Sequence, residues 1–244
     1  EKGLKVIKET NQMKALIKAE IIRLYKNKLF VGGNTLAFLI TVGFCKYLNM
    51  VRPSQSGIHN FYANFISLGI MAFSSLFTAL FIGEQYMGGV IRNKVIAGHK
   101  QTTIYVSSMI AIFVGVLTTT GCWFAGCLVA GYYLESYTLK FVLILLFAAI
   151  AYAGILTTVA MRVINTTMCC GITMGIFFVS YVAATGVHAA YVWAEEGTGM
   201  IWKVLLDVMP MGQWFAIFAR DGAELPLTVM LLLSSMLTIL AYLA

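Results

Sequence analysis

The sequence predicts an all-α membrane protein that crosses the bilayer six times. Hydrophobic residues make up 60% of its 244 residues and charged residues only 11%, whereas soluble domains carry about 25% charged residues. Several apolar runs reach the roughly 20 residues that a helix needs to cross a bilayer. Two of these runs, residues 60–83 and 101–134, contain no charged residue. We expect one membrane-embedded domain at residues 29–244, preceded by an N-terminal segment at residues 1–28.

The N-terminal segment is expected to include a helix that lies along the membrane surface. Within residues 12–28, the apolar side chains share one helical face, and Lys14, Lys18 and Arg23 lie away from it. This amphipathic pattern is typical of interfacial helices. A simple extension of the first span is the alternative, which the density of charge disfavours. The residues of the apolar face are Met13, Leu16, Ile17, Ile21 and Leu24.

Six apolar runs are assigned as membrane spans. Each run has the length that a crossing requires. The first run is the weakest, because Asn34 and Thr35 interrupt it and Lys46 must extend outward to reach water. The predicted spans are residues 29–50, 61–83, 104–132, 141–161, 167–192 and 225–244.

The basic residues set the expected orientation. With the N-terminus inside, 12 of the 17 basic residues lie in cytoplasmic segments and 5 in external ones, as the positive-inside rule requires. Six spans then place both termini in the cytoplasm. Eight of the basic residues fall within the first 28 positions, beside a span, where they suit anionic lipid. No basic groove with interleaved aromatic residues follows, so a nucleic-acid partner is not expected.

The loop between the second and third spans, residues 88–100 (GGVIRNKVIAGHK), has the pattern of a short basic helix. Three apolar residues have helical spacing, two basic residues interleave with them, and Gly98 stands where a helix would stop. The positive-inside rule alone explains the sign of the charges. It does not explain the spacing or the two bracketing glycines. We therefore expect a helix that docks a cytoplasmic partner.

The segment before the last span, residues 193–224, is predicted to form an external re-entrant or interfacial hairpin. It holds two apolar pieces, residues 200–209 and 213–219, separated by Pro210 and Gly212. Each piece is too short to cross the bilayer. An ordinary folded loop is the alternative, which the apolar composition disfavours. The tryptophans that suit the headgroup level are Trp193, Trp202 and Trp214.

The chain lacks the motifs of common catalytic sites. It has no GxxxxGK[ST], HExxH or GxSxG sequence, so no P-loop nucleotide site, zinc-protease site or serine-hydrolase site is expected. No span centre carries an ionisable residue, which counts against ion-coupled carriers and voltage sensors. His188, near the end of the fifth span, is interpreted as a packing residue.

The five cysteines are interpreted as small packing residues. They show neither CxxC spacing nor a nearby histidine, so no metal site and no disulfide are predicted. The residues are Cys45, Cys122, Cys127, Cys169 and Cys170.

The order of these elements, and one local motif, resemble the permease subunits of type-2 ABC exporters. Residues 88–107 (GGVIRNKVIAGHKQTTIYVS) are similar to the G-x-I-R-N-K-x-x-x-G-x-x-R-x-x-I-Y-x-S stretch of bacterial peptide-efflux and antimicrobial-peptide-immunity permeases. Lys100 or Gln101 stands roughly where those proteins often have arginine. The segment LLDVMPMGQWFAI resembles their proline-containing external turn. The resemblance runs from about Met13 to the end of the chain.

The resemblance implies a multi-pass exporter subunit in a bacterial cytoplasmic membrane, driven by separate ABC ATPase subunits. Residues 88–100 would be the coupling helix and residues 12–28 the connecting helix. ATP and Mg²⁺ would bind the ATPase, with neither a cofactor nor a catalytic residue on this chain. Two copies, or the chain and a paralogue, would pair through the second and fifth spans. The residues implied in coupling are Gly89, Val90, Ile91, Arg92, Lys94, Val95, Gly98, His99 and Lys100.

The translocation path is expected to be apolar and aromatic, which suits an amphipathic or hydrophobic substrate such as a membrane-active peptide. For each aromatic residue, packing within the bundle or against lipid is an equally weighted alternative. The glycines of a GxxxG pair in the fifth span would allow two helices to approach closely. The residues assigned to the path and dimer interface are Phe65, Phe73, Phe77, Gly171, Gly175, Phe177, Phe178 and Tyr181, and those of the external gate are Trp202, Pro210 and Trp214.

Two other function classes remain open. An ATP-independent carrier or channel subunit would lose transport in the presence of an ionophore and would have no ATPase partner. An intramembrane protease would centre on Glu195, Glu196 or a histidine. The arginine and the histidine pair that such a site needs are missing from the sequence.

Overall fold

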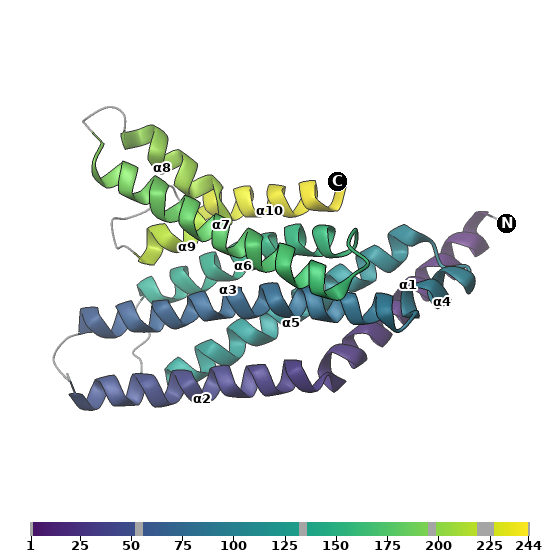
Figure 1. The fold of residues 1–244 in the computed structure, drawn as a ribbon, viewed down its shortest axis with the longest axis horizontal. Helices are drawn as coiled ribbons and strands as arrows, with labels where there is room; N and C mark the ends of the chain where they lie inside the picture. The colour runs from purple at the N-terminus through teal and green to yellow at the C-terminus, as the bar shows by residue number, and fades with distance from the viewer. Residues whose placement is uncertain (1, 52–55, 132–135, 195–198, 219–226, 244) are drawn as a thin grey trace.

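The computed structural model describes residues 2–51, 56–131, 136–194, 199–218 and 227–243, and these residues form ten α-helices and no strand. Most of the helices run lengthwise through one elongated bundle (Figure 1). The helices are α1 (Lys2–Lys26), α2 (Lys28–Val51), α3 (Ser56–Met87), α4 (Val90–Ile96), α5 (Gln101–Val129), α6 (Ser136–Ala160), α7 (Thr166–Val192), α8 (Gly199–Val208), α9 (Pro210–Phe218) and α10 (Leu227–Leu243).

Five of the described helices are long and apolar enough to cross a membrane, so the described part of the chain has the helices of a multi-pass membrane protein. They are α2, α3, α5, α6 and α7, which correspond to the first five predicted spans. The last helix, α10, has 17 described residues, packs along α6 and runs back toward the end that carries α4 (Figure 1). A sixth crossing and the orientation in the membrane stay predictions.

Two glycines bracket α4. Gly89 has φ 66° and Gly98 has φ 86°, in the left-handed region that favours glycine. At the C-terminal end, the amide of Gly98 donates to the Val95 carbonyl at 3.0 Å and that of His99 donates to the Lys94 carbonyl at 3.1 Å. These bonds satisfy carbonyl groups that the end of a helix leaves free. A seven-residue helix therefore forms within the predicted basic segment.

The predicted apolar face of the N-terminal segment is largely covered by the chain itself. Leu16 and Leu24 are buried, and Leu24 packs beside Gly115 of α5. At Asn27 the chain passes from α1 into α2, and the Asn27 side chain accepts hydrogen bonds from the first amides of α2, including Leu29 at 2.9 Å. We had expected this face to lie on lipid. In the structure α1 packs mainly on α5, because its apolar face meets the apolar surface of the bundle.

The predicted hairpin before the last span is present as α8 and α9, with Met209 alone between them. Pro210 is the first residue of α9, where a missing amide costs nothing. Gly212 lies in the first turn of α9, and a Cβ added there would overlap the Leu206 carbonyl oxygen. The two apolar pieces therefore meet at a sharp turn, at the end of the bundle opposite α4 (Figure 1).

Two clusters of buried side chains form the core. One cluster surrounds Leu24, Phe77 and Phe81, and the other contains Tyr152 and Trp214. Cys45 and Cys127 belong to the second cluster and Cys169 to the first, and all five cysteines are free. The core therefore extends from the neighbourhood of α1 to the α8–α9 hairpin.

Candidate functional site

Helix α4 turns one side toward the bundle and the other toward solvent. Val90, Ile91 and Lys94 are partly covered, whereas Arg92 is exposed. The side chain of Ile96 is 72% exposed. The sequence pattern predicts an apolar docking face at Val90, Ile91 and Val95. In the structure, the exposed apolar residues at this place are Met87, Val95 and Ile96.

Lys94 is held inside the chain by a buried carboxylate. It forms an ion pair with Glu20 of α1 and donates a hydrogen bond to Gln85 Oε1 of α3 at 3.0 Å. Gln85 Nε2 in turn donates to Glu20 Oε2 at 2.9 Å. Glu20 is 2% exposed and Gln85 is fully buried. We call Glu20, Gln85 and Lys94 the polar cluster; it ties α1, α3 and α4 together.

Arg23 links the polar cluster to the aromatic core. Its Nη1 lies 4.0 Å from Glu20 Oε2, and its Nη2 donates to the Phe81 carbonyl at 3.1 Å. The guanidinium also lies over the Phe81 ring, 4.9 Å from its centroid. Burial lowers the pKa of Arg23 from its usual value, and the carboxylates of Glu20 and Glu84 partly oppose this shift. Arg23 therefore contacts both the Glu20 carboxylate of the polar cluster and the Phe81 ring of α3.

Three phenylalanines one helical turn apart continue this line along α3. Phe81 and Phe77 have ring centroids 5.6 Å apart, and Phe77 and Phe73 have centroids 5.9 Å apart with nearly parallel rings. Phe30 of α2 packs on Phe77 at 5.0 Å. We call Phe73, Phe77 and Phe81 the aromatic column. Phe77, which we had assigned to the substrate path, lies in the core.

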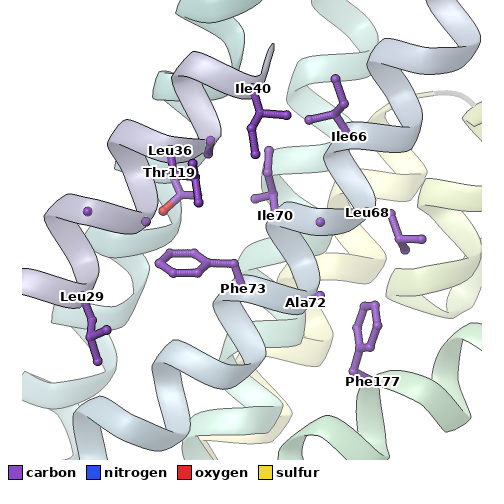
Figure 2. A pocket seen from close by; sticks show the side chains of 14 residues that line it. Leu29, Leu36, Ile40, Ile66, Leu68, Ile70, Ala72, Phe73, Thr119 and Phe177 are labelled. Atoms are coloured by element: carbon purple, nitrogen blue, oxygen red, sulfur yellow. The ribbon is translucent and has the colours of Figure 1, made fainter. Parts of the chain in front are cut away.

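The column ends at an apolar groove of about 740 Å³ between α2 and α3. In Figure 2, Phe73 reaches from α3 toward α2, and Phe177 of α7 lies on the far side of α3 near Leu68 and Ala72. A Cβ on Gly33 would overlap the Phe73 ring, so Gly33 makes room for it. The groove is open at the bundle surface, because the lining residues Leu29, Leu36 and Ile40 are each at least half exposed.

The other residues assigned to the path lie on different surfaces. Gly171 and Gly175 are exposed on α7 and have no neighbour within 4 Å of an added Cβ, and Phe178 is 57% exposed. Tyr181 is partly buried beside the core. Phe65 lies among residues whose side chains the structure does not describe. The structure thus brings Phe73 and Phe177 to the groove, while the GxxxG pair faces outward.

Hydrogen bonds between side chains fasten the α8–α9 hairpin to the bundle. Trp214 Nε1 donates to Ser67 Oγ of α3 at 2.5 Å, and Ser234 Oγ of α10 donates to Gln213 Oε1 at 2.8 Å. Trp214 is 1% exposed, so its ring packs inside the bundle and is not on the outer surface of the hairpin. Trp202 is exposed and Pro210 is partly covered. Glu195 and Glu196 lie outside the described residues.

Sequence reasoning missed the burial of Glu20, Gln85 and Asp207. Glu20 interrupts the apolar face of residues 12–28, which was the available signal. Among the described residues, no group of three or more histidine, cysteine, aspartate or glutamate side chains could hold a metal ion. The site therefore offers charge pairing and apolar surface.

No protein-family model matches this chain, and neither does any curated protein.

Proposed function

We propose that the chain is the transmembrane subunit of an ATP-driven exporter, with α4 as the helix that docks a separate ATPase. The observation that carries the proposal is the geometry of α4. One side of this helix is tied to α1 and α3 through the polar cluster, and the other exposes Arg92, Val95 and Ile96. A helix that is fixed on one side and exposed on the other suits a partner that must move it.

The aromatic column supplies a physical route for that movement. The contacts run from Lys94 through Glu20, Arg23 and Phe81 to Phe73 at the groove, with no gap between neighbours. Packed interiors transmit displacement because they are dense and resist compression. A shift of α4 would therefore displace α3 beside the groove. Alternating access by rigid-body motion of packed helices is the corresponding mechanism.

The groove favours an amphipathic or hydrophobic substrate. Thr119 is the one polar residue among the described lining residues, and the rest are glycine, aliphatic residues and phenylalanine. Such a surface offers almost no hydrogen bonds to a sugar or an ion. A membrane-active peptide, with one apolar face, fits this chemistry. The exposed α7 face of Gly171, Gly175 and Phe178 is the expected contact with a second permease copy or a paralogue.

The test is co-purification with a P-loop ATPase and ATP hydrolysis by the complex. The variants Arg92→Glu and Ile96→Asp change only exposed positions of α4 and leave Lys94 in place. We expect both variants to insert and fold normally, and to lower transport-coupled ATP hydrolysis at least tenfold. A chain that transports without any ATPase, or variants with unchanged coupling, would refute the proposal.

A second candidate function, an ion-coupled carrier, is favoured by one observation. Asp207 is a fully buried carboxylate, and among the described residues the other buried charged residue is Glu20. Buried carboxylates often bind a coupling ion or a proton in carriers. Transport by the purified chain alone, abolished by an ionophore, would support the carrier.

A further inference from the structure

Helix α8 buries or partly buries its charged residues and exposes most of its apolar ones, the reverse of a surface helix in a soluble protein. Its apolar residues Ile201, Val204 and Leu205 are exposed, and its two charged residues face the bundle. Lys203 is partly buried and Asp207 is 0% exposed. This arrangement suits a helix whose outer face meets lipid, and it places a carboxylate where water does not reach it.

The Asp207 carboxylate is buried without a hydrogen-bond donor. Neither Oδ1 nor Oδ2 accepts a hydrogen bond. Its backbone carbonyl accepts a hydrogen bond from Gln213 Nε2 at 2.8 Å, so the residue stands at the point where α8 is tied to α9. A buried ionised carboxylate without donors is costly, whereas a protonated one is tolerated. Burial raises the pKa of Asp207 to about 6, and Lys203 partly opposes the shift.

Few other titratable groups lie on the elements that pack against α8. These elements are α7, α9 and α10. On α7, the described titratable side chains in the last turns before α8 are His188 and Tyr191, whose rings lie 6.5 Å apart. The described part of α9 and α10 offers no charged side chain. A pH effect on the hairpin can therefore be assigned by testing Asp207, Lys203 and His188 one at a time.

We propose that Asp207 is a proton-binding residue that controls the α8–α9 hairpin: the protonated carboxyl keeps α8 docked, and loss of the proton releases α8 from the bundle. The ionised carboxylate must gain water or hydrogen-bond donors, and the docked position supplies neither. Movement of α8 away from α7 and α10 opens the docked contact and lets water reach the carboxylate. Transfer of the proton to water completes the step, and no covalent bond other than O–H is broken.

The sign of the pH dependence follows from the raised pKa of Asp207. The docked hairpin binds the proton more tightly than the released hairpin, whose carboxyl has an ordinary pKa near 3.8. Docking is therefore most favourable below that value and weakens as the pH rises through about 6. The opening constant of the hairpin should rise by up to about 100-fold across this range.

The experiment is amide hydrogen exchange of residues 199–214, measured on the full chain in nanodiscs from pH 4 to pH 8 and corrected for intrinsic exchange rates. The wild-type hairpin should exchange faster as the pH rises, with a midpoint near 6, while amides of α5 stay protected. Asp207→Asn should stay protected throughout. Lys203→Met should move the midpoint to higher pH, because it removes the cation that favours the ionised form.

The outcomes separate this inference from the exporter assignment, because no ATPase is present in the experiment. His188→Gln is the matched control and should leave the midpoint in place. A wild-type hairpin whose corrected exchange does not change with pH overturns the proposal, even if Asp207→Asn fails to fold. A midpoint that survives in Asp207→Asn, or disappears in His188→Gln, overturns it as well.

Discussion

Glu20 is stable in the interior because three side chains surround it. Lys94 and Arg23 supply positive charge, and Gln85 supplies a hydrogen-bond donor. A buried carboxylate without them would carry a desolvation cost of several kcal/mol. The cluster also changes how the basic loop is understood. The sequence pattern predicts that Lys94 binds a partner protein. In the structure, the Lys94 ammonium group pairs with Glu20 of the same chain.

Removing one charged side chain from the polar cluster should lower the free energy of unfolding more than removing two. Lys94→Met leaves Glu20 buried with less compensation, and about 3–5 kcal/mol of stability should be lost. The double variant Glu20→Met with Lys94→Met removes both charges and should recover most of that loss. Thermal unfolding in detergent measures both. Exposed Arg92→Met is the control, expected to change stability by less than about 0.5 kcal/mol. Equal losses for Lys94→Met and Arg92→Met would contradict the cluster's role.

Neighbouring glycines of α2 provide a second test at this scale. Gly33→Ala places a methyl group into the Phe73 ring, whereas Gly32→Ala meets no atom within 4 Å. We expect Gly33→Ala to lower the melting temperature and Gly32→Ala to leave it unchanged or raise it slightly. Phe73→Leu should rescue the Gly33→Ala variant. If the two glycine variants behave alike, Phe73 does not pack on Gly33 as described.

At the scale of helices, the long apolar runs were predictable and their packing partners were not. The bracketing glycines of α4 were read correctly, because a helix stop after Ala97 requires a residue that tolerates positive φ. The inward turn of Lys94 depends on Glu20, which lies 74 residues away in the chain. The burial of Trp214 depends on Ser67, which lies 147 residues away. Local patterns contain no information on such pairs, since only the assembled bundle brings them together.

The α8–α9 turn should tolerate no side chain at Gly212. A Cβ there would overlap the Leu206 carbonyl oxygen, and two backbone segments would have to separate. We expect Gly212→Ala to increase proteolysis within residues 199–218 severalfold without unfolding the bundle. Gly186→Ala on α7 meets no atom within 4 Å and serves as the control. Wild-type resistance of Gly212→Ala would show that the turn is looser than the structure indicates.

At the scale of the whole molecule, two spans leave much of their surface uncovered. Only 22% of the apolar window of α2 and of α7 is buried within the chain, compared with 61% for α3. Apolar surface of this kind is covered in a membrane by lipid or by another helix. The second predicted span is α3, whose apolar surface is mostly buried within the chain. Pairing of two chains through α3 is therefore less favoured than pairing through α7.

The α7 face predicts a specific defect in self-association. Gly175→Leu adds bulk to an exposed GxxxG position and should weaken pairing of two chains at least roughly tenfold. Gly43→Leu, at an exposed position of α2 with no neighbour within 4 Å, is the matched control. Light scattering in detergent across a range of protein concentrations gives the mass of each. A wild-type chain that stays monomeric, or equal effects of both variants, would rule out a homodimer through α7.

The pairing of Glu20 with Lys94 also fixes an order of events during synthesis. Glu20 leaves the ribosome 74 residues before its cation, which corresponds to roughly 4–15 s at 5–20 residues per second. During that interval its carboxylate has no Lys94 to pair with, so α1 has to keep it in contact with water. Helix α1 can reach its final position only after α4 has been made, and its main packing partner α5 is made later still. The first helix of the chain is therefore among the later ones to reach its final position.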